Sequence, residues 1–389
     1  MHLHWSTAYC GGAWVISGYE EVASALRDPR FTVRRAARWI NSALGERSDD
    51  DCDQQAQQRF KRLFSRSLLF LDGRAHRRLR GVLNPGFKPA ELQAQRAGIT
   101  ALAHRLIDDI VADPKSANGF DFIGRFARPL PALVIAQLLG LPDRVPAQFI
   151  DWAADLAAFI GSPTPDAAQT RAAQDALAEL CQFFTQVLER PADLAPGCLV
   201  STLLQAHQDR QLNRTELLAQ CCTLLFAGYE TTRNLLGNGL LALLQHPDQW
   251  AALKAQQDDT AALRLAVREM LRHDSPVQYT GRRLLQDVAM GGQTLRRGQL
   301  AILHIGQANH DARRFSEPHR FDIRRDEGMH LSFGQGPHVC LGAALTQLEA
   351  EIAFSALIQR LPALTLADTP PIWQDNAAYR ALDRLSVFF

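Results

Sequence analysis

The chain of 389 residues lacks paired cysteine spacings, an excess of charge of either sign, and an apolar run at its start. Its seven cysteines are odd in number, scattered, and without a Cys-x-x-Cys motif, which favours a reducing cytoplasm over a disulfide framework. A net charge of +1 excludes a general attraction to nucleic acid or to acidic membranes. Because no basic region precedes an apolar segment near residue 1, we expect neither a secretion signal nor a membrane anchor.

Cofactor fingerprints for electron carriers are also missing. The chain has no glycine-rich dinucleotide or flavin motif and no cysteine cluster of the iron–sulfur type. It has no internal repeat and nothing that resembles a linker, while 47% hydrophobic and 21% charged residues are typical of a globular protein with an ample core.

Hydrophobic periodicity predicts a protein that is mainly α with a small β-rich portion. Residues 12–17 indicate a short strand, followed by a helix over 19–26 and a turn at Asp28-Pro29. From about 88 to 270 the pattern is helical, with its clearest breaks at the prolines of 162–165 and 191–196. Short β-like pieces then follow, among them 286–290 and 300–304.

The longest predicted helix covers residues 213–245 and would span about 45 Å. Asn213 and Glu216 form a plausible capping box at its start. A membrane span is the competing interpretation of its apolar content. Glu230 and Arg233 argue against it, because a charge at mid-bilayer costs a few kcal/mol.

The most informative segment is 333–342, Phe-Gly-Gln-Gly-Pro-His-Val-Cys-Leu-Gly, which leads into a run of strong helix formers. We expect Gly334, Gly336 and Gly342 to permit positive φ values and close backbone approach to a flat ligand. The sulfur of Cys340 would feel the helix dipole and the free amides of the first turn, which favour a thiolate that ligates a metal. The alternative is a buried free cysteine acting as a small hydrophobe.

This pattern, Phe-Gly-x-Gly-x-His-x-Cys-x-Gly, resembles the heme-binding loop of the cytochrome P-450 heme-thiolate monooxygenases. The resemblance implies heme b (iron protoporphyrin IX) with Cys340 as the axial ligand of the iron, and Phe333, His338 and Gly342 among the cofactor-binding residues. It also implies a single cytochrome P-450 domain over 1–389, a triangular helix-rich prism with the heme between the long central helix and the helix after the cysteine loop.

The chain departs from the family pattern shortly after Cys340 and before the first predicted strand. Thr346 and Gln347 stand where the family has Ala and often Arg. Relatives usually carry several tens of residues before the strand at Trp14-Val15, so we expect most of the usual first helix to be missing.

A second motif, Ala-Gly-Tyr-Glu-Thr-Thr at 227–232, interrupts the long helix. Gly228 costs about 1 kcal/mol relative to Ala in a helix, and threonines can bend it, so we expect a kinked, widened segment that approaches a ligand. The alternative is a locally imperfect surface helix. The segment resembles the family's oxygen-binding motif, which implies that Ala227 and Gly228 pack near the heme, that Thr231 hydrogen-bonds oxygen or its water, and that Glu230 relays protons.

Glu269 and Arg272 form an i,i+3 pair that is weak evidence alone. With the other motifs it resembles the Glu-x-x-Arg of the family. Arg325 would be the third member of a structural ion network that holds the loop before Cys340, although Arg324 is adjacent and could be mistaken for it.

Two heme propionates would need cationic partners. The family pattern implies four candidates: His76, Arg80, Arg282 and His338. Neighbouring Arg74, Arg77 and Arg78 are expected to form a solvated basic face, which could steer an acidic redox partner. A run Asp72-Gly73-Arg74 departs from the Asp-Pro-Pro-Glu common in relatives.

The resemblance therefore implies a cytoplasmic, O2-dependent monooxygenase that hydroxylates or epoxidises a small hydrophobic substrate in secondary metabolism. A separate ferredoxin and its ferredoxin reductase would supply electrons. Alternatives are oxidative coupling, desaturation or peroxide use, and a heme-free module that recruits partners; such modules lack the cysteine loop. The pocket walls are expected from four regions: 35–70, 150–190, the face around Leu225 and Thr232, and 277–279.

Overall fold

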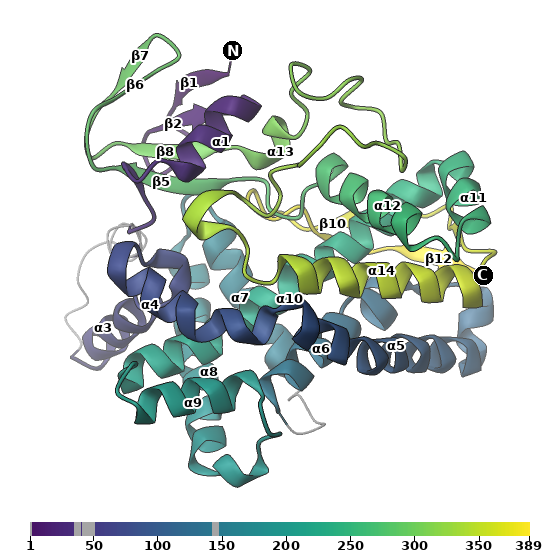
Figure 1. Ribbon diagram of the computed structural model, residues 1–389, viewed down its shortest axis with the longest axis horizontal. Coiled ribbons are helices and arrows are strands. Elements are labelled where there is room, and N and C mark those ends of the chain that lie inside the picture. Colours follow the sequence, from purple (N-terminus) through teal and green to yellow (C-terminus); the bar gives the residue numbers. More distant parts are fainter. Residues whose placement is uncertain (1, 35–39, 41–50, 142–147) are drawn as a thin grey trace.

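A helix-rich body carries a small β-rich part at one side in this computed structural model, which describes residues 2–34, 40, 51–141 and 148–389 (Figure 1). The predicted fold class is confirmed. The helices are α1 Tyr19–Arg27, α3 Asp51–Phe64, α4 Gly73–Leu83, α5 Pro89–Ala112, α6 Pro129–Leu139, α7 Gln148–Gly161, α8 Ala167–Glu189, α9 Leu199–Gln208, α10 Arg214–Gln245, α11 Pro247–Ala255, α12 Thr260–His273, α13 Ile305–Ala308 and α14 Ala343–Arg360.

The largest sheet has five strands in the order β1-β2-β8-β5-β3. β2 and β8 pair in parallel, with Val15 opposite Ile302, and the other neighbours are antiparallel. Three smaller sheets have the orders β10-β11, β4-β12-β9 and β6-β7. The strands are β1 Leu3–Ser6, β2 Ala13–Ile16, β3 Phe31–Thr32, β4 Phe120–Asp121, β5 Thr280–Leu284, β6 Val288–Met290, β7 Gln293–Leu295, β8 Leu300–Leu303, β9 Thr365–Leu366, β10 Ile372–Trp373, β11 Leu382–Arg384 and β12 Ser386–Phe388.

Most predicted elements lie where the periodicity placed them. The strand before α1, the turn after it, the breaks on either side of α8 and the β pieces after residue 277 are all present. The sequence patterns did not predict β1 or the short strands β9–β12. All are short, and β12 also depends on a partner distant in the sequence, because it pairs with β4 as well as with β9.

Helix α10 crosses the helical body and is 32 residues long. Its predicted capping box is present, with Asn213 Oδ1 accepting from the Glu216 N–H at 3.0 Å and Glu216 Oε2 accepting from the Asn213 N–H at 3.0 Å. Residues on every face of the helix are buried because α6, α8, α12 and α14 surround it. A Cβ on Gly228 would lie 2.6 Å from Cδ1 of Ile135, so the glycine lets α10 and α6 approach closely.

Within the described part of the chain, no helix combines the length and the apolar character that crossing a bilayer requires.

His330, at the start of the cysteine loop, supplies a pH-dependent contribution to stability. The residue is buried, its Nδ1 accepts from the Ser332 N–H at 3.2 Å, and burial together with Arg268 and Arg272 lowers its pKa to about 3. The unfolded chain therefore binds this proton near pH 6.5 while the folded protein does not, so the stabilisation is present above that pH and is lost as the pH falls.

We expect the free energy of unfolding to fall between pH 7 and pH 5 less steeply in His330→Gln than in the unmodified protein. The difference should reach about 2 kcal/mol at pH 5, because each pH unit below 6.5 is worth about 1.4 kcal/mol for one proton. Urea denaturation at several pH values measures it. Equal slopes in the two proteins would contradict the prediction.

Candidate active site

The loop before α14 presents Cys340 in a closed turn. The Cys340 N–H donates to the Phe333 carbonyl at 2.8 Å, and the loop between them turns through Gly334 with φ 68° and Gly336 with φ 72°. A Cβ on Gly336 would also lie 3.0 Å from the Leu26 carbonyl oxygen, so both backbone conformation and space require glycine here.

Gly342 differs from the expectation. It is the N-cap residue of α14 with φ −87°, so the predicted positive φ is wrong at this position. Because the helix begins at Ala343, Cys340 lies before the first helical turn rather than within it.

The thiol of Cys340 is exposed, but to an interior cavity rather than to bulk water. Burial raises the pKa of this thiol, while a hydrogen bond from the Gly342 backbone and the charge of Arg80 act in the opposite direction. The backbone donor thus acts in the direction expected for a loop before a helix, but desolvation of the charged sulfur outweighs it. A bound metal ion would reverse the balance, since coordination deprotonates a thiol.

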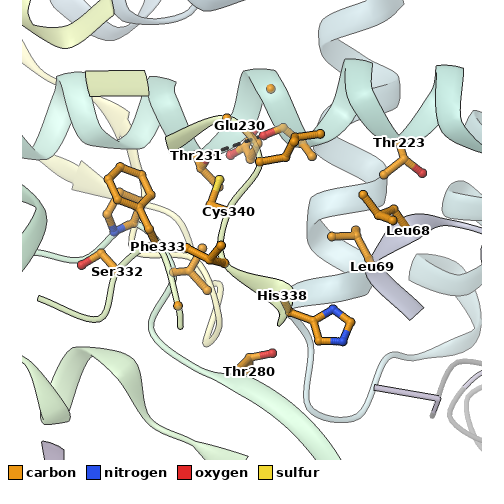
Figure 2. A pocket seen from close by; sticks show the side chains of 18 of the residues that line it. Leu68, Leu69, Thr223, Glu230, Thr231, Thr280, Ser332, Phe333, His338 and Cys340 are labelled. Carbon is orange, nitrogen blue, oxygen red and sulfur yellow. Dashed lines mark hydrogen bonds between the residues drawn. The ribbon is translucent and has the colours of Figure 1, made fainter. Parts of the chain in front are cut away.

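The cavity next to Cys340 has a volume of about 360 Å³ and lies between α10, α4, β5, the cysteine loop and the start of α14. Figure 2 shows the Cys340 side chain pointing toward the helix that carries Glu230 and Thr231. All of the cofactor-binding and catalytic residues predicted from the sequence line this cavity: His76, Arg80, Ala227, Gly228, Glu230, Thr231, Arg282, Phe333, His338, Cys340 and Gly342.

The expected pocket walls are only partly those observed. Leu68 to Phe70, Ile160, Val277 and Tyr279 line the cavity, whereas Leu225 and Thr232 do not. Their neighbours on α10, Leu224 and Thr231, face it instead. Residues 35–39 and 41–50 of the predicted wall lie outside the described residues.

Helix α10 passes the cavity as one continuous helix. The Thr231 hydroxyl lies 3.4 Å from the Ala227 carbonyl oxygen, one turn earlier. Glu230 is buried, and its Oε1 is 2.7 Å from Nη1 of Arg233. Arg233 also donates to the Leu382 carbonyl at 2.6 Å, which fixes its guanidinium.

Two arginines and two histidines line the cavity together with the cysteine loop. Nη1 of Arg80 donates to the Pro337 carbonyl at 3.2 Å, and Nη1 of Arg282 donates to the Thr280 hydroxyl at 2.8 Å. The rings of His76 and His338 lie 4.2 Å apart, and burial lowers the pKa of His76 to about 4.

Asp72, which the sequence analysis noted only as a departure from the family, belongs to this cluster. Its Oδ1 lies 2.8 Å from Nε2 of His338, and its Oδ2 accepts from Thr32 and from the Val33 N–H. Burial acts to raise the pKa of Asp72, but the hydrogen bonds from His338 and Thr32 outweigh it and lower the pKa to about 2. The sequence could have indicated this role, because Asp72 is the N-cap residue of α4 and precedes His76 by four residues.

The donor set of this cavity fits heme b. A thiol opens to the cavity for the iron, two guanidinium groups and two imidazoles are available for the propionates, and the walls facing α10 are largely apolar.

An ion network stands behind the cysteine loop. Both carboxylate oxygens of Glu269 bind Arg272, at 2.7 and 2.9 Å, and Nε of Arg325 lies 3.3 Å from Glu269. Arg324 is exposed, and its backbone N–H donates to Asp322 Oδ1 at 3.0 Å. The network joins α12 to the segment before the loop.

Two further residues make contacts that the sequence did not predict. Arg78 is exposed, as expected for a solvated basic face, but its Nη2 also lies 2.5 Å from the buried carboxylate of Glu216 on α10. Thr346, one of the departures from the family, lines the cavity, and its hydroxyl is 3.4 Å from that of Thr232.

Comparison with known proteins agrees with this site. The family model "Cytochrome P450" matches residues 36–378. The biotin biosynthesis cytochrome P450 of Bacillus subtilis (strain 168) is 35% identical over 376 residues, which cover 97% of this chain and 90% of the relative. The 6-deoxyerythronolide B hydroxylase of Saccharopolyspora erythraea is 32% identical over 386 residues, with 96% and 90% covered.

A solved structure gives the same result. The complex of P450BioI with hexadec-9Z-enoic acid ligated acyl carrier protein superposes with a TM-score of 0.88 at 33% identity, covering 100% of this chain and 95% of the other. The chain belongs to the cytochrome P450 family. It is a monooxygenase that binds heme b and uses O2, an organic substrate and redox partners.

The buried pair Glu230–Arg233 should be costly to break. We expect Arg233→Ala to lower the free energy of unfolding by about 3–5 kcal/mol, because it leaves a buried carboxylate without a partner, and the double variant with Glu230→Gln to recover much of this loss. Urea denaturation measures both.

The matched control is Arg320→Ala, which removes an i,i+3 pair with Glu317 of 3.0 Å whose side chains are 59% and 71% exposed. Its loss should stay within about 1 kcal/mol. A loss for Arg233→Ala no larger than that of the control would contradict the prediction.

Proposed function

We propose that this single-domain chain, residues 1–389, inserts one oxygen atom of O2 into a small apolar organic molecule, by hydroxylation or epoxidation, in secondary metabolism. The observation that carries the proposal is the cavity itself, which the Cys340 thiol and the α10 segment with Glu230 and Thr231 share (Figure 2). The relatives named above support it. The scattered cysteines support a cytoplasmic location.

We assign the holding of the cofactor to two groups of residues. Cys340 would ligate the iron, and Arg80, Arg282, His76 and His338 would bind the propionates. When bound, heme b with a thiolate ligand supplies the activation of O2 and the transfer of one oxygen atom. Phe333, Gly342, Ala227 and Gly228 would form the walls against the flat ring.

Thr231 and Glu230 would manage protons in this otherwise apolar site. Among the described residues, the Thr231 hydroxyl has one hydrogen-bond partner, the Ala227 carbonyl at a long 3.4 Å, so it can turn and donate into the cavity. The Glu230 carboxylate is occupied by Arg233 and also lies 3.4 Å from Nδ2 of Asn234. The Glu230 carboxylate would have to separate from Arg233 before it could take up a proton and pass it to Thr231. The ion pair would therefore limit proton delivery to the cavity.

The substrate is expected to be apolar because the walls away from the cysteine loop are apolar. Leu68, Leu69, Phe70, Ile135 and Leu224 contribute to them. The structural relative that carries a hexadecenoic acyl chain on its carrier protein supports an extended apolar substrate. Long-chain acyl compounds are therefore the first ligands to screen by the spin-state shift of the heme spectrum.

A ferredoxin and its reductase are proposed as the electron donors. Exposed Arg74 and Arg77 lie on α4, the helix whose Arg80 contacts the cysteine loop, and their charge suits an acidic partner. A product with one added oxygen atom supports hydroxylation or epoxidation, whereas the loss of two hydrogen atoms would show desaturation or coupling.

We expect the reduced, CO-treated protein to show the Soret band characteristic of thiolate ligation and Cys340→Ala to lose it, because alanine offers no ligand. Cys10→Ala is the matched control, since this exposed cysteine lies outside the cavity and should leave the band unchanged. A thiolate-type band that persists in Cys340→Ala would refute the assignment.

We expect Thr231→Val to form product at least about tenfold more slowly and to release more peroxide per electron pair, because valine keeps the shape and removes the proton donor. Thr100→Val is the control, since Thr100 makes the same i−4 contact, to Arg96 at 2.9 Å, on α5 outside the cavity. Product and peroxide are measured with the ligand that gives the largest spin-state shift. Equal yields from both variants would contradict the role of Thr231.

A further inference from the structure

Gln220 is a fully buried amide on α10 that the proposed chemistry does not use. Its Oε1 accepts from the Leu68 N–H at 3.0 Å, and its Nε2 donates to the Arg66 carbonyl at 2.8 Å. One side chain thus pairs the backbone on both sides of Ser67, as a neighbouring strand would, and ties the segment Arg66–Phe70 to the helix.

A second link lies one turn further along α10. The Thr223 hydroxyl is 2.9 Å from the Ser67 hydroxyl and 2.6 Å from the Ala219 carbonyl oxygen, and Ser67 accepts from the Leu69 N–H at 3.2 Å. The Thr223 hydroxyl has one proton, which it can donate to Ser67 or to the Ala219 carbonyl oxygen. Its contact with Ser67 forms the second link between α10 and this segment.

Gln220 and Thr223 lie on the same side of α10 as Thr231. Residues 216, 220, 223, 227 and 231 follow one another at intervals of three or four and so share one side of α10. Glu216 anchors one end through Arg78, and Thr231 faces the cavity at the other. Because Gln220 and Thr231 belong to the same helix, the bonds of Gln220 fix the position of the 66–70 segment relative to Thr231.

This segment forms a partition. Leu68, Leu69 and Phe70 line the main cavity, and Figure 2 shows Leu68 and Leu69 beside Thr223. Behind them lies a second void of about 30 Å³, lined among others by Ser67, Leu69 and Phe70. Movement of the segment would join the two spaces and change the length and shape of the apolar end of the cavity.

We propose that Gln220 is a positioning residue for substrate selection: by holding Leu68 and Leu69 in place, it sets the apolar end of the cavity and favours ligands with an extended apolar chain. The inference rests on the proposed function, because it concerns the same cavity. Gln220 acts through the backbone of Arg66 and Leu68 and touches no reacting atom.

The test compares two probes that ligate heme iron through the same nitrogen, imidazole and 1-dodecylimidazole, by titration of the Soret band. Only the second carries an apolar chain that can reach the partition. In Gln220→Met, which keeps the shape and removes both hydrogen bonds, we expect 1-dodecylimidazole to bind about tenfold more weakly and imidazole to bind as before.

Gln249→Met is the matched control. Gln249 also accepts a backbone N–H, that of Ile323 at 3.1 Å, but it lies outside the cavity. Both probes should bind this variant with unchanged affinity. If Gln220→Met binds both probes as the unmodified protein does, or weakens both equally, the proposal is overturned.

Gln220→Glu provides a second measurement and replaces the first if Gln220→Met does not retain heme. The carboxylate of this variant can still accept from the Leu68 N–H but cannot donate to the Arg66 carbonyl, so the loss of affinity for 1-dodecylimidazole should be intermediate. Protonation of this carboxylate at lower pH restores a donor. The loss, measured as the ratio to the affinity for imidazole, should then become smaller. A ratio of the two affinities that does not change with the variant or with pH would overturn the proposal. Absence of any thiolate-type CO band in the unmodified protein would instead overturn the proposed function.

Discussion

The burial of α10 on all sides is the constraint on which the rest of the structure depends. A polar side chain on such a helix has little water to bind, so it needs a partner within the protein, in another segment or on the helix itself. Glu216 binds Arg78 of α4, Gln220 binds the 66–70 segment, and Glu230 binds Arg233, which in turn reaches the Leu382 carbonyl. These contacts organise the walls of the cavity around one continuous helix.

The cysteine loop works under a related constraint. Its sulfur faces a cavity shielded from bulk water, where the charged form is disfavoured, and nearby donors do not overcome this. Heme ligation would therefore supply the charge compensation that the loop itself lacks, which couples cofactor binding to the ionisation of the ligand. The buried ion network at Glu269 holds the approach to the loop, so that the sulfur is positioned by segments other than α14 alone.

Features that depend on neighbours in the chain could be predicted. The bounds of α10 follow from its capping box and apolar pattern, and the turns at Gly334 and Gly336 follow from glycine in a short loop. The cofactor-binding and catalytic residues that line the cavity could be predicted because each belongs to a short motif that resembles the family. Interactions between distant segments could not be found this way: Asp72 and His338 are 266 residues apart, and Gln220 and Arg66 are 154 apart.

The amino-acid order alone was sufficient for the helix-rich class, the long helix and the choice of Cys340 as the candidate ligand, because helix periodicity, capping and loop glycines act within a few residues. Packing decided the rest. The surfaces that meet, and the water that they exclude, decide three pairings. Arg78 pairs with Glu216, Asp72 faces His338, and Arg233 holds Glu230. The same exclusion of water set the direction of the pKa shift at Cys340, which no local pattern revealed.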